Sequence, residues 1–310
     1  MYERSLFVFR RDLRLQDNTG LCRAIQASKT VLPVFIFDPR QAKNKENKYF
    51  SPNAFQFLIE SLRELTAQIE ERGGSLFFFE GKPGSVLSRL VRMGGYEAVF
   101  ANRDYTPFAR RRDEKLQEEI ENAGATFHLS DDALLTSPES VLSEEGEPFF
   151  VYSHFKQAAR AVPIDDPEPL GRPSFEQALL PSSASADAAG LPRCTLDDYD
   201  RYYNGDLAVS GGRSDGEARL DSLDGFRYYS RKRHRLDDYT VTGLSAHLKF
   251  GTVSPREVFA EIKDRYNVRH KLISQLFWRD FYTQFAYHFP SVFGRAVRPK
   301  DRYIDWRSNE

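Results

Sequence analysis

Short runs of consecutive apolar residues alternate with longer amphipathic stretches over the first 130 residues. The apolar runs have the length of strands buried on both faces, and lie at residues 6–10, 31–37, 76–79, 98–101 and 126–129. In three intervening stretches apolar residues recur every three or four positions, which predicts helices at 52–71, 85–93 and 109–122. The alternation predicts a doubly wound, Rossmann-like α/β domain over residues 1–130, with a parallel sheet covered on both faces.

Polar residues follow several of these predicted strands. Arg11 follows the first, Asp38 the second and Asp104 the fourth. Because ligands of doubly wound sheets bind beyond the carboxyl ends of the strands, we expect these three side chains near a ligand site. No Gly-x-Gly-x-x-Gly follows the first strand, so the dinucleotide fingerprint is absent.

The composition changes between residues 131 and 205, where Pro, Ser and Ala are frequent. This predicts a long, mostly irregular connector with one helical piece near residues 154–160. The carboxylate pairs Asp131-Asp132 and Asp165-Asp166 fall in loop-like sequence. We interpret them as solvated or capping groups rather than as catalytic ones.

Residues 206–310 show helical patterns and predict an all-α second domain. We expect one helix over 216–229, one over 245–250 with Ser245 as its N-cap, and one over 271–289. Another begins at Ser254, followed by a proline and by Glu257 at the capping-box position, and runs to about residue 266.

The predicted helix at 271–289 carries the most informative side chains. At 3.6 residues per turn, one side presents an amide, two aromatic rings and a cation, from Gln275, Trp278, Arg279 and Tyr282. Such a surface suits a planar ligand that carries phosphates. The alternative is that Trp278 fills the core and Arg279 is a solvated charge, since amphipathic helices with an aromatic residue are common.

Composition narrows the function classes. Aromatic residues make up 14% of the chain, and two cysteines are too few for a disulfide framework or a zinc cluster, which indicates a reducing, cytoplasmic setting. No apolar run is long enough for a membrane span. Residues 201–310 carry 20 Lys and Arg against 14 Asp and Glu, a net charge of +6, whereas the whole chain has −1. A polyanionic partner would therefore prefer the C-terminal third.

A basic run around Arg233 lies in this positive region, shortly before Thr242 and Ser245. The usual interpretation of a charge run is a solvated face, but this run favours a nucleotide or nucleic-acid site. Motifs for zinc deaminases, serine hydrolases and P-loop proteins are absent, and the histidines lack metal-ligand spacing. A flat, redox-active organic cofactor fits these residues better than hydrolysis.

Four motifs in order resemble those of the DNA photolyase/cryptochrome family. They are residues 6–18 (LFVFRRDLRLQDN), 102–105 (NRDY) with 112–113 (RD), 244–251 (LSAHLKFG) with Ser254, and 278–281 (WRDF). The resemblance, which is greatest to class I-type cyclobutane pyrimidine dimer photolyases, implies an α/β antenna domain, a connector over 131–205 and a helical FAD-binding domain from residue 206. It also implies light-driven electron transfer from reduced FAD to a flipped-out lesion in UV-damaged DNA.

The same resemblance assigns roles to individual residues. Tyr229, Thr242, Leu244 and Ser245 match FAD-contacting positions, and Arg279 matches a cation near the FAD phosphates. Arg233 matches a contact to DNA phosphate, Trp278 the aromatic that packs against the lesion, and Trp306 the outermost tryptophan of the chain that photoreduces the flavin. Asp104 and Lys249 match positions used by relatives that bind deazaflavin, with Arg11 and Asp38 close by in the expected sheet.

Three departures leave alternatives open. Gln275 stands where common bacterial members place a glutamate, and is more typical of (6-4) photolyases. Val241 and Gly243 replace a hydroxyl and an arginine in the flavin motif. Phe108-Ala109 replaces a folate-binding Asn-Glu pair, so we expect 8-hydroxydeazaflavin or FMN as antenna pigment rather than methenyltetrahydrofolate.

The family also continues for more than a hundred residues beyond the position of Glu310. A C-terminal fragment that completes the FAD domain is therefore an expected partner. We expect a monomer on DNA that associates with the nucleoid and needs no metal. The leading hypothesis is cyclobutane-dimer repair, and the alternatives are a cryptochrome-type photoreceptor and a non-catalytic part of a split photolyase.

Overall fold

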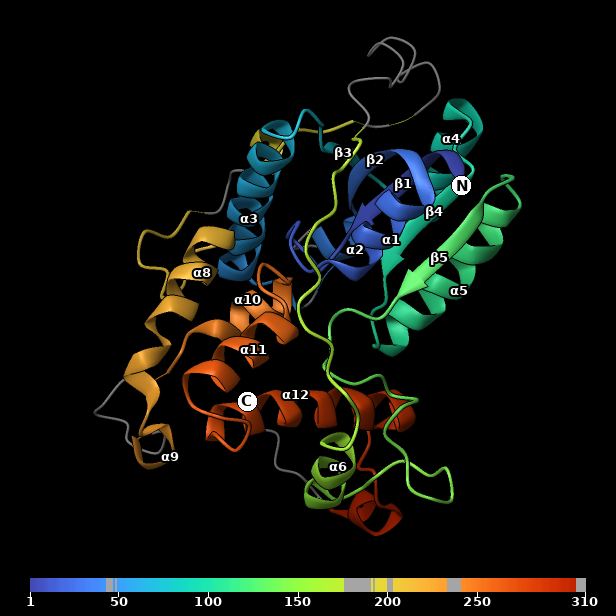
Figure 1. Cartoon of the computed structure of the whole chain (residues 1–310). Helices are drawn as coiled ribbons and strands as arrows, with labels where there is room; N and C mark the ends of the chain where they lie inside the picture. The colour runs from blue at the N-terminus through green and yellow to red at the C-terminus, as the bar shows by residue number, and fades with distance from the viewer. Residues whose placement is uncertain are drawn as a thin grey trace.

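The computed structural model describes residues 1–42, 47, 49–175, 191, 193–199, 203–232 and 241–304. An α/β part lies above a helical part in the view of Figure 1, and the connector runs between them. Arg233 and Trp306 lie outside the described residues. Nothing in the structure therefore bears on the roles predicted for these two side chains.

The predicted parallel sheet is confirmed. Its five strands are all parallel, in the order β3-β2-β1-β4-β5. They are β1 (Tyr2–Phe9), β2 (Ser28–Phe37), β3 (Phe77–Glu80), β4 (Ala98–Asn102) and β5 (Thr126–Ser130). The central strand β1 is flanked by β2 and β4, so the strand order reverses there and the carboxyl ends of β1 and β4 form a topological switch point.

Helices cover both faces of the sheet. One face packs against α1 (Thr19–Ala27) and α3 (Pro52–Glu70), and the other against α4 (Pro83–Gly94) and α5 (Pro107–Glu121). The sequence pattern predicted three of these, and the structure adds α1 and the short α2 (Pro39–Ala42). The start of α1 is fixed by Asn18, whose side chain accepts a hydrogen bond from the Leu21 N–H at 3.1 Å.

The connector is more ordered than its composition predicted. It forms α6 (Tyr152–Ala159) in the helical part and then returns along the α/β part, as Figure 1 shows. Phe175 is buried in the α/β core, and the turn η1 (Asp197–Tyr199) places the Tyr199 ring on Phe37, with centroids 4.0 Å apart. The described connector residues therefore contribute to the core instead of only spanning a gap.

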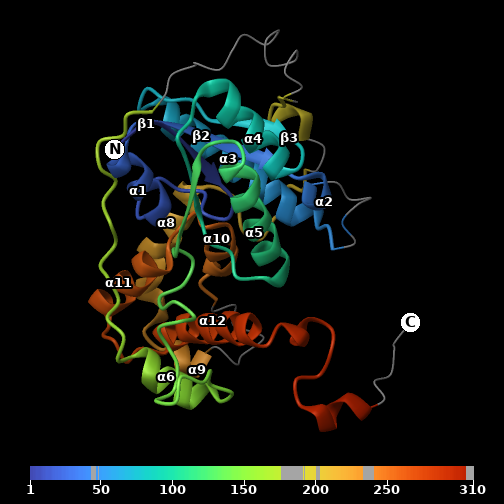
Figure 2. The ribbon, with the colours of Figure 1, turned by 90° about the vertical axis from the view of Figure 1, so that its right-hand side faces the viewer.

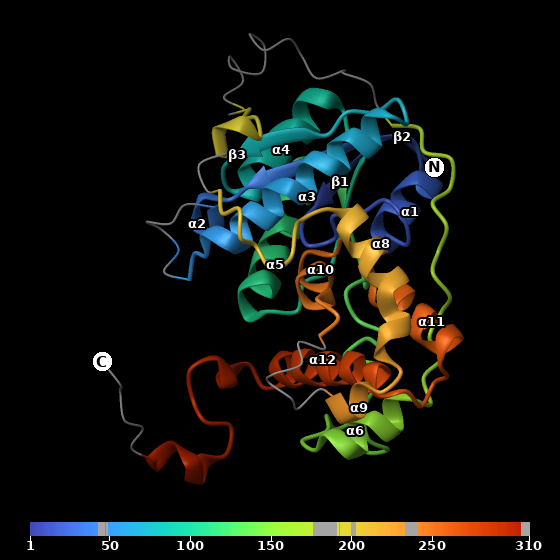
Figure 3. The same ribbon diagram turned by 90° about the vertical axis from the view of Figure 1, so that its left-hand side faces the viewer.

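The helical part contains α8 (Arg213–Asp221), η2 (Ser222–Phe226), α9 (Tyr229–Lys232), α10 (Leu244–Phe250), α11 (Pro255–Arg265) and α12 (Lys271–His288). The turn η3 (Pro290–Phe293) follows α12 directly, and the stretch that carries the turn η4 (Pro299–Tyr303) projects away from the other helices (Figures 2 and 3). Among the described residues, no helix is both long and apolar enough to cross a membrane.

Two predictions for the helical part were wrong in detail. The single helix expected over 216–229 is broken at Ser222, whose hydroxyl donates to the Arg219 carbonyl at 2.9 Å and competes with the helical pattern. The N-cap of α10 is Gly243 rather than Ser245, because Gly243 adopts a φ of 69° that ends the preceding loop. The capping box of Ser254 and Glu257 at the start of α11 is confirmed.

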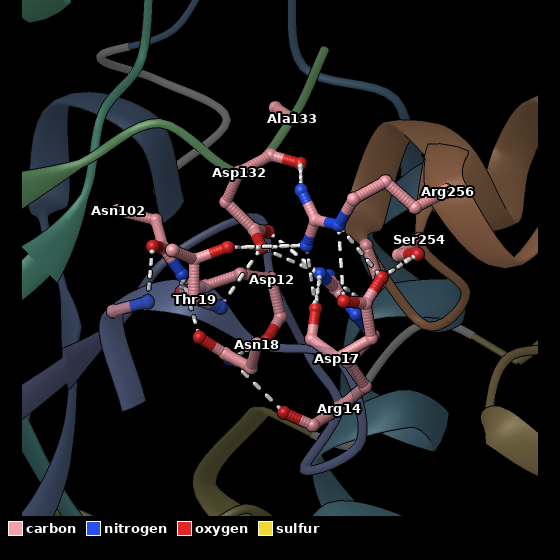
Figure 4. A network of polar contacts seen from close by, with 12 residues as sticks. Asp12, Arg14, Asp17, Asn18, Thr19, Asn102, Asp132, Ala133, Ser254 and Arg256 are labelled. Carbon is pink, nitrogen blue, oxygen red and sulfur yellow. Dashed lines mark hydrogen bonds and ion pairs between the residues drawn. The ribbon is translucent and has the colours of Figure 1, made fainter. Parts of the chain in front are cut away.

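A buried polar network joins the two parts (Figure 4). Arg256 of α11 donates to Asp17 Oδ1 at 3.0 Å and to Asp132 Oδ1 at 3.0 Å, and Arg14 donates to the same Asp132 oxygen at 2.7 Å. Burial opposes ionisation of Asp132, but the two arginines outweigh it and hold the pKa of Asp132 below its usual range. Asp132 is therefore not solvated, since its side chain is 2% exposed, but it does contact a helix start, because its Oδ1 accepts from the Thr19 N–H of α1 at 3.1 Å.

The backbones of the two parts approach closely at Gly251. A Cβ on this residue would lie 2.2 Å from the Arg11 carbonyl oxygen and 2.5 Å from the Asp12 Cα, and its φ is 69°. The Leu13 N–H donates to the Phe250 carbonyl at 3.1 Å beside this contact. Gly251 thus holds α10 directly against the segment that follows β1.

Candidate functional site

A cavity of about 340 Å³ opens where the switch point of the sheet meets the helical part. We call it the interface cavity. Its lining combines the segments after β1 and β4 with residues of α10, α12 and η3, and includes Arg11, Asp104, Lys249, Arg279, Tyr282, Thr283, Ala286 and Phe293. The structure therefore brings together Arg11, Asp104 and Lys249, which the sequence placed at one ligand site, and adds Arg279 to them.

Positive charge predominates on the wall of this cavity. The Arg11 Nη1 lies 3.6 Å from Asp104 Oδ2, and the Arg11 Nε donates to the Lys249 carbonyl at 3.0 Å. Burial, together with the nearby Arg11, lowers the pKa of Lys249. The lining holds five cations against three carboxylates: Arg10, Arg11, Arg103, Lys249 and Arg279 against Asp12, Asp104 and Asp132. This excess of positive charge favours an anionic or electron-rich ligand.

Arg279 is held in the wall by main-chain oxygens. Its guanidinium donates to the Ala133 carbonyl and, at 3.1 Å, to the Leu248 carbonyl. Burial is the main reason that the pKa of Arg279 is lowered, and Asp280 acts in the opposite direction. These contacts fix the guanidinium between the connector, α10 and α12, so the cation is placed before any ligand arrives.

The inner end of the cavity is built by Asp12 and Asn102. Asp12 accepts from the Arg10 N–H at 2.6 Å and from Asn102 Nδ2 at 2.6 Å. Burial raises the pKa of Asp12 to about 6. A ligand that enters the cavity therefore meets a titratable group at its inner end.

Asp38 does not line the interface cavity. It follows β2 and is 5% exposed, and it forms an ion pair with Arg40, whose Nη2 lies 2.5 Å from Asp38 Oδ2. The sequence placed Asp38 near the antenna residues because parallel strands end at one edge. The structure shows instead that the Asp38 carboxylate is paired with Arg40, two positions along the chain.

The surface predicted on α12 is divided in the structure. Arg279 and Tyr282 line the interface cavity, whereas the Trp278 ring stacks on Tyr152 of α6, with centroids 3.5 Å apart and planes inclined by 8°. Consecutive helical positions point about 100° apart, so Trp278 and Arg279 reach different partners. Gln275 lies one turn before Trp278, and its Nε2 is buried without a hydrogen-bond partner among the described residues.

The residues matched to the FAD site lie on α9, on α10 and, for Thr242, in the loop just before α10. Tyr229 packs partly buried against the helical core, and Leu244 is buried in it. Thr242 Oγ1 accepts from the Leu244 N–H at 3.4 Å, and Ser245 is exposed. These four side chains neighbour the stretch 233–240, which lies outside the described residues, and none of them lines the interface cavity with Arg279.

One cation near this region was missed by the sequence reasoning. A Cβ on Gly243 would lie 2.0 Å from Arg219 Nη1, so the Arg219 guanidinium occupies the space beside this glycine. Its Nε donates to Asp215 Oδ2 at 2.6 Å, and the same oxygen lies 2.9 Å from His247 Nε2. The i,i+4 spacing of Asp215 and Arg219 was a usable signal, but nothing in the sequence linked Arg219 to Gly243.

Comparisons with known proteins agree with this architecture. The family model described as DNA photolyase matches residues 5–173, more than half of the chain. A deoxyribodipyrimidine photo-lyase of Synechococcus is 30% identical over 98% of this chain and 65% of its own length. A cryptochrome DASH of Natronomonas pharaonis is 29% identical over 96% of this chain and 65% of its own.

Among solved structures, an archaeal photolyase from Sulfolobus tokodaii, described with two FAD molecules and with the implication of a novel light-harvesting cofactor, has a TM-score of 0.83 and 34% identity. The match covers 99% of this chain and 64% of that one. This chain therefore spans about two thirds of the length of these relatives. Matched in sequence over most of its length and in fold throughout, the chain belongs to the DNA photolyase family.

Proposed function

We propose that this chain carries the antenna-pigment site and part of the flavin and lesion site of a light-driven enzyme that splits cyclobutane pyrimidine dimers in DNA. Within it, residues 1–130 form the antenna domain, 131–205 the connector and 206–310 the first part of the FAD and DNA-binding domain. The observation that carries the proposal is the interface cavity, because its position at the switch point, its volume and its cations all suit a flat, electron-rich ring.

The interface cavity is the proposed antenna site. Arg11, Lys249 and Arg279 supply positive charge, and Tyr282 and Phe293 supply aromatic surface. We propose a deazaflavin or FMN as the pigment there, and the solved relative with two FAD molecules adds FAD to the candidates. The pigment, when bound, absorbs light and passes the energy on, while the protein excludes water and fixes the ring.

For the flavin site, the residues present fit a phosphate-bearing cofactor in part. Tyr229, Thr242, Leu244 and Ser245 lie on neighbouring elements, and Arg219 fills the space beside Gly243 with a cation. We propose that Arg219 supplies the positive charge that the arginine of the usual family motif supplies from the position of Gly243. FAD, when bound, supplies the electron for dimer cleavage, and the residues of this chain hold and orient it.

The lesion site is proposed beside Gln275 and Trp278. A buried amide without a partner is costly, so the unpaired Nε2 of Gln275 favours a ligand acceptor at that position. A carbonyl of a pyrimidine base is such an acceptor. The same chemistry suits a (6-4) product, and repair assays on both lesions distinguish the two.

The antenna proposal is tested by reconstitution of the purified chain with FMN or 8-hydroxydeazaflavin. We expect binding to the wild type to quench or shift the fluorescence of the pigment. Lys249→Glu should weaken the pigment affinity, because the variant reverses one charge of the wall. The control is Lys29→Glu. Lys29 is an exposed residue at the start of β2, away from the cavity, where it pairs with Glu3 of β1. Equal pigment affinity in the wild type and Lys249→Glu contradicts the placement of the pigment in this cavity.

A second candidate function is a blue-light photoreceptor of the cryptochrome type. It is favoured by one observation: one face of the Trp278 ring is covered by Tyr152. In a receptor this stack is permanent, whereas in a repair enzyme it opens or becomes a wall of the lesion site. Light-dependent loss of dimers from irradiated oligothymidylate separates the two functions.

A further inference from the structure

A second cavity, of about 190 Å³, lies on the α/β part outside the interface cavity. We call it the basic pocket. It is formed by residues of α2, the loop before α4, α4 itself and α5, near the carboxyl ends of β2 and β3. Its lining contains five cations and one acid: Arg40, Lys82, Arg111, Arg112, Lys115 and Glu119.

Several of these charges are not neutralised within the protein. Arg40 is paired with Asp38, and Lys115 lies 3.5 Å from Glu119. Within the described ranges, the side chains of Lys82 and Arg111 have neither an ion pair nor a hydrogen bond. The pocket therefore keeps an excess of positive charge that a bound anion would balance.

Arg112 is placed with one edge unused. Its Nε donates to Asp113 Oδ1 at 2.9 Å, and the other oxygen of Asp113 accepts from Arg10 at 3.0 Å. The Arg112 side chain is only 12% exposed, and its buried Nη2 has no hydrogen-bond partner among the described residues. A guanidinium fixed on one side and unsatisfied on the other is suited to a bidentate oxyanion.

A carboxylate, that of Glu119, already lies at the start of α4. The N-cap residue Lys82 makes no side-chain cap, and a Cβ on Gly84 would lie 1.3 Å from Glu119 Oε2. The absence of a side chain at Gly84 thus lets a negatively charged oxygen reach the first turn of a twelve-residue helix. Glu119 stands in a position that a phosphate oxygen would share or take over.

An aromatic surface lies beside these cations. The Arg40 guanidinium carbon lies 5.0 Å from the centroid of the Phe108 ring, and Phe108 is at the surface of the pocket. A guanidinium and a ring at this separation form a flat, polarisable surface. The pocket therefore offers contacts for a planar group next to contacts for an anion.

We propose that the basic pocket binds a phosphate ester, with the phosphate on Lys82, Arg111 and Arg112 and an attached planar group on Phe108. Two ligands share this chemistry. One is a free nucleotide. The other is the phosphate tail of a pigment whose ring lies in the interface cavity, since Asp113 contacts both Arg112 of the basic pocket and Arg10 of the interface cavity. The second source rests on the proposed antenna function, and the first does not.

The test is calorimetric titration of the purified chain with ADP, inorganic pyrophosphate, adenosine, FMN and riboflavin. For each phosphate-bearing ligand that binds, we expect the affinity to fall about tenfold or more in the double variant Lys82→Gln/Arg111→Gln, because charge-assisted hydrogen bonds are lost. The exposed Lys29→Gln is the matched charge control and is expected to change nothing. Both substituted side chains are without partners within the described ranges, so the double variant is expected to fold normally.

The ligand series separates the two sources. Tight binding of ADP and pyrophosphate but not adenosine, retained in Ala286→Trp, which fills the interface cavity, identifies a free nucleotide. FMN binding that exceeds riboflavin binding, with the difference abolished by Lys82→Gln/Arg111→Gln, identifies a pigment tail. If no phosphate ligand binds more weakly to the double variant, the proposal is overturned. In that case, binding of FMN and riboflavin to the wild type would still support the antenna site. If neither binds to the wild type, the antenna proposal fails as well.

Discussion

Tyr152 and Trp278 lie face to face, with ring centroids 3.5 Å apart and planes inclined by 8°. The Tyr152 hydroxyl donates to the Ser274 carbonyl at 2.8 Å, which holds the ring in place from α12 itself. The Tyr282 ring, one turn further along α12, lies 5.3 Å from Trp278 with planes inclined by 23°. Trp278 is thus part of an aromatic stack that extends towards the interface cavity, and any base that meets its covered face must displace Tyr152.

Tyr152→Leu is expected to expose Trp278. The chain has two tryptophans, so we propose the measurement in a Trp306→Phe background, where Trp278 is the sole indole. Loss of the stacked ring should shift the emission to longer wavelength, while Tyr152→Phe keeps the ring and should leave the emission close to that of the parent. Identical spectra for all three proteins would show that Tyr152 does not cover Trp278 in solution.

Arg256→Met is expected to destabilise the protein by about 3–5 kcal/mol, because it leaves Asp17 and Asp132 buried without one of their cations. Arg265→Met, on the same helix, removes the exposed pairs of Arg265 with Asp224 and Glu261 and should cost less than about 1 kcal/mol. Denaturant unfolding followed by circular dichroism measures both. Equal losses would contradict the role of the network in joining the two parts.

Asp280→Asn is expected to change how stability depends on pH. Burial raises the pKa of Asp280 to about 7, and its Oδ1 has no hydrogen-bond partner among the described residues, with the Arg279 Nη1 4.0 Å away. A raised pKa means that the folded state holds the proton more tightly than the unfolded state, so stability falls as pH rises from about 4 to 7.

Asparagine keeps an oxygen that accepts from the N–H groups of Leu135 and Thr136, as Asp280 Oδ2 does at 3.0 Å, and it carries no charge. The variant should therefore lose less stability than the wild type between pH 5 and pH 8. Parallel stability curves for the two proteins across this range, from denaturant unfolding, would show that Asp280 does not titrate there.

Gly251→Ala is expected to separate the helical part from the segment after β1. The substitution places a methyl group 2.2 Å from the Arg11 carbonyl oxygen at a φ of 69°, and the conformational cost alone is roughly 1–2 kcal/mol. Gly225→Ala is the control, because a Cβ there meets nothing within 4 Å. Thermal unfolding should show a lower Tm for Gly251→Ala and little change for Gly225→Ala, and equal Tm values would disprove the close approach.

The α/β part could be predicted well from the sequence because its central strands are buried on both faces. Strands such as residues 98–101 are uniformly apolar, and helices such as α3 and α5 begin with Ser51 and Thr106 as N-caps. Local signals of this kind do not depend on distant residues. The capping box of Ser254 and the bounds of α12 were predictable for the same reason.

The site was only partly predictable, because long-range contacts decide where side chains point. Asp132 looked like a loop carboxylate, but Arg14 and Arg256, which bury it, come from segments 118 and 124 positions away. Arg279 was expected beside Trp278, but the carbonyls of Ala133 and Leu248 hold it in the interface cavity. Sequence periodicity fixes a helix face and not the partner that the face meets.

The most direct test of the account is light-dependent repair by the purified protein that contains this chain. Oligothymidylate carrying cyclobutane dimers is incubated with FAD-loaded, reduced protein, and the recovery of absorbance at the thymine band is followed in light and in darkness. We expect recovery in light only, and loss of that recovery in Gln275→Leu and Trp278→Ala. Normal photoreduction of the flavin without any recovery of thymine absorbance would contradict it.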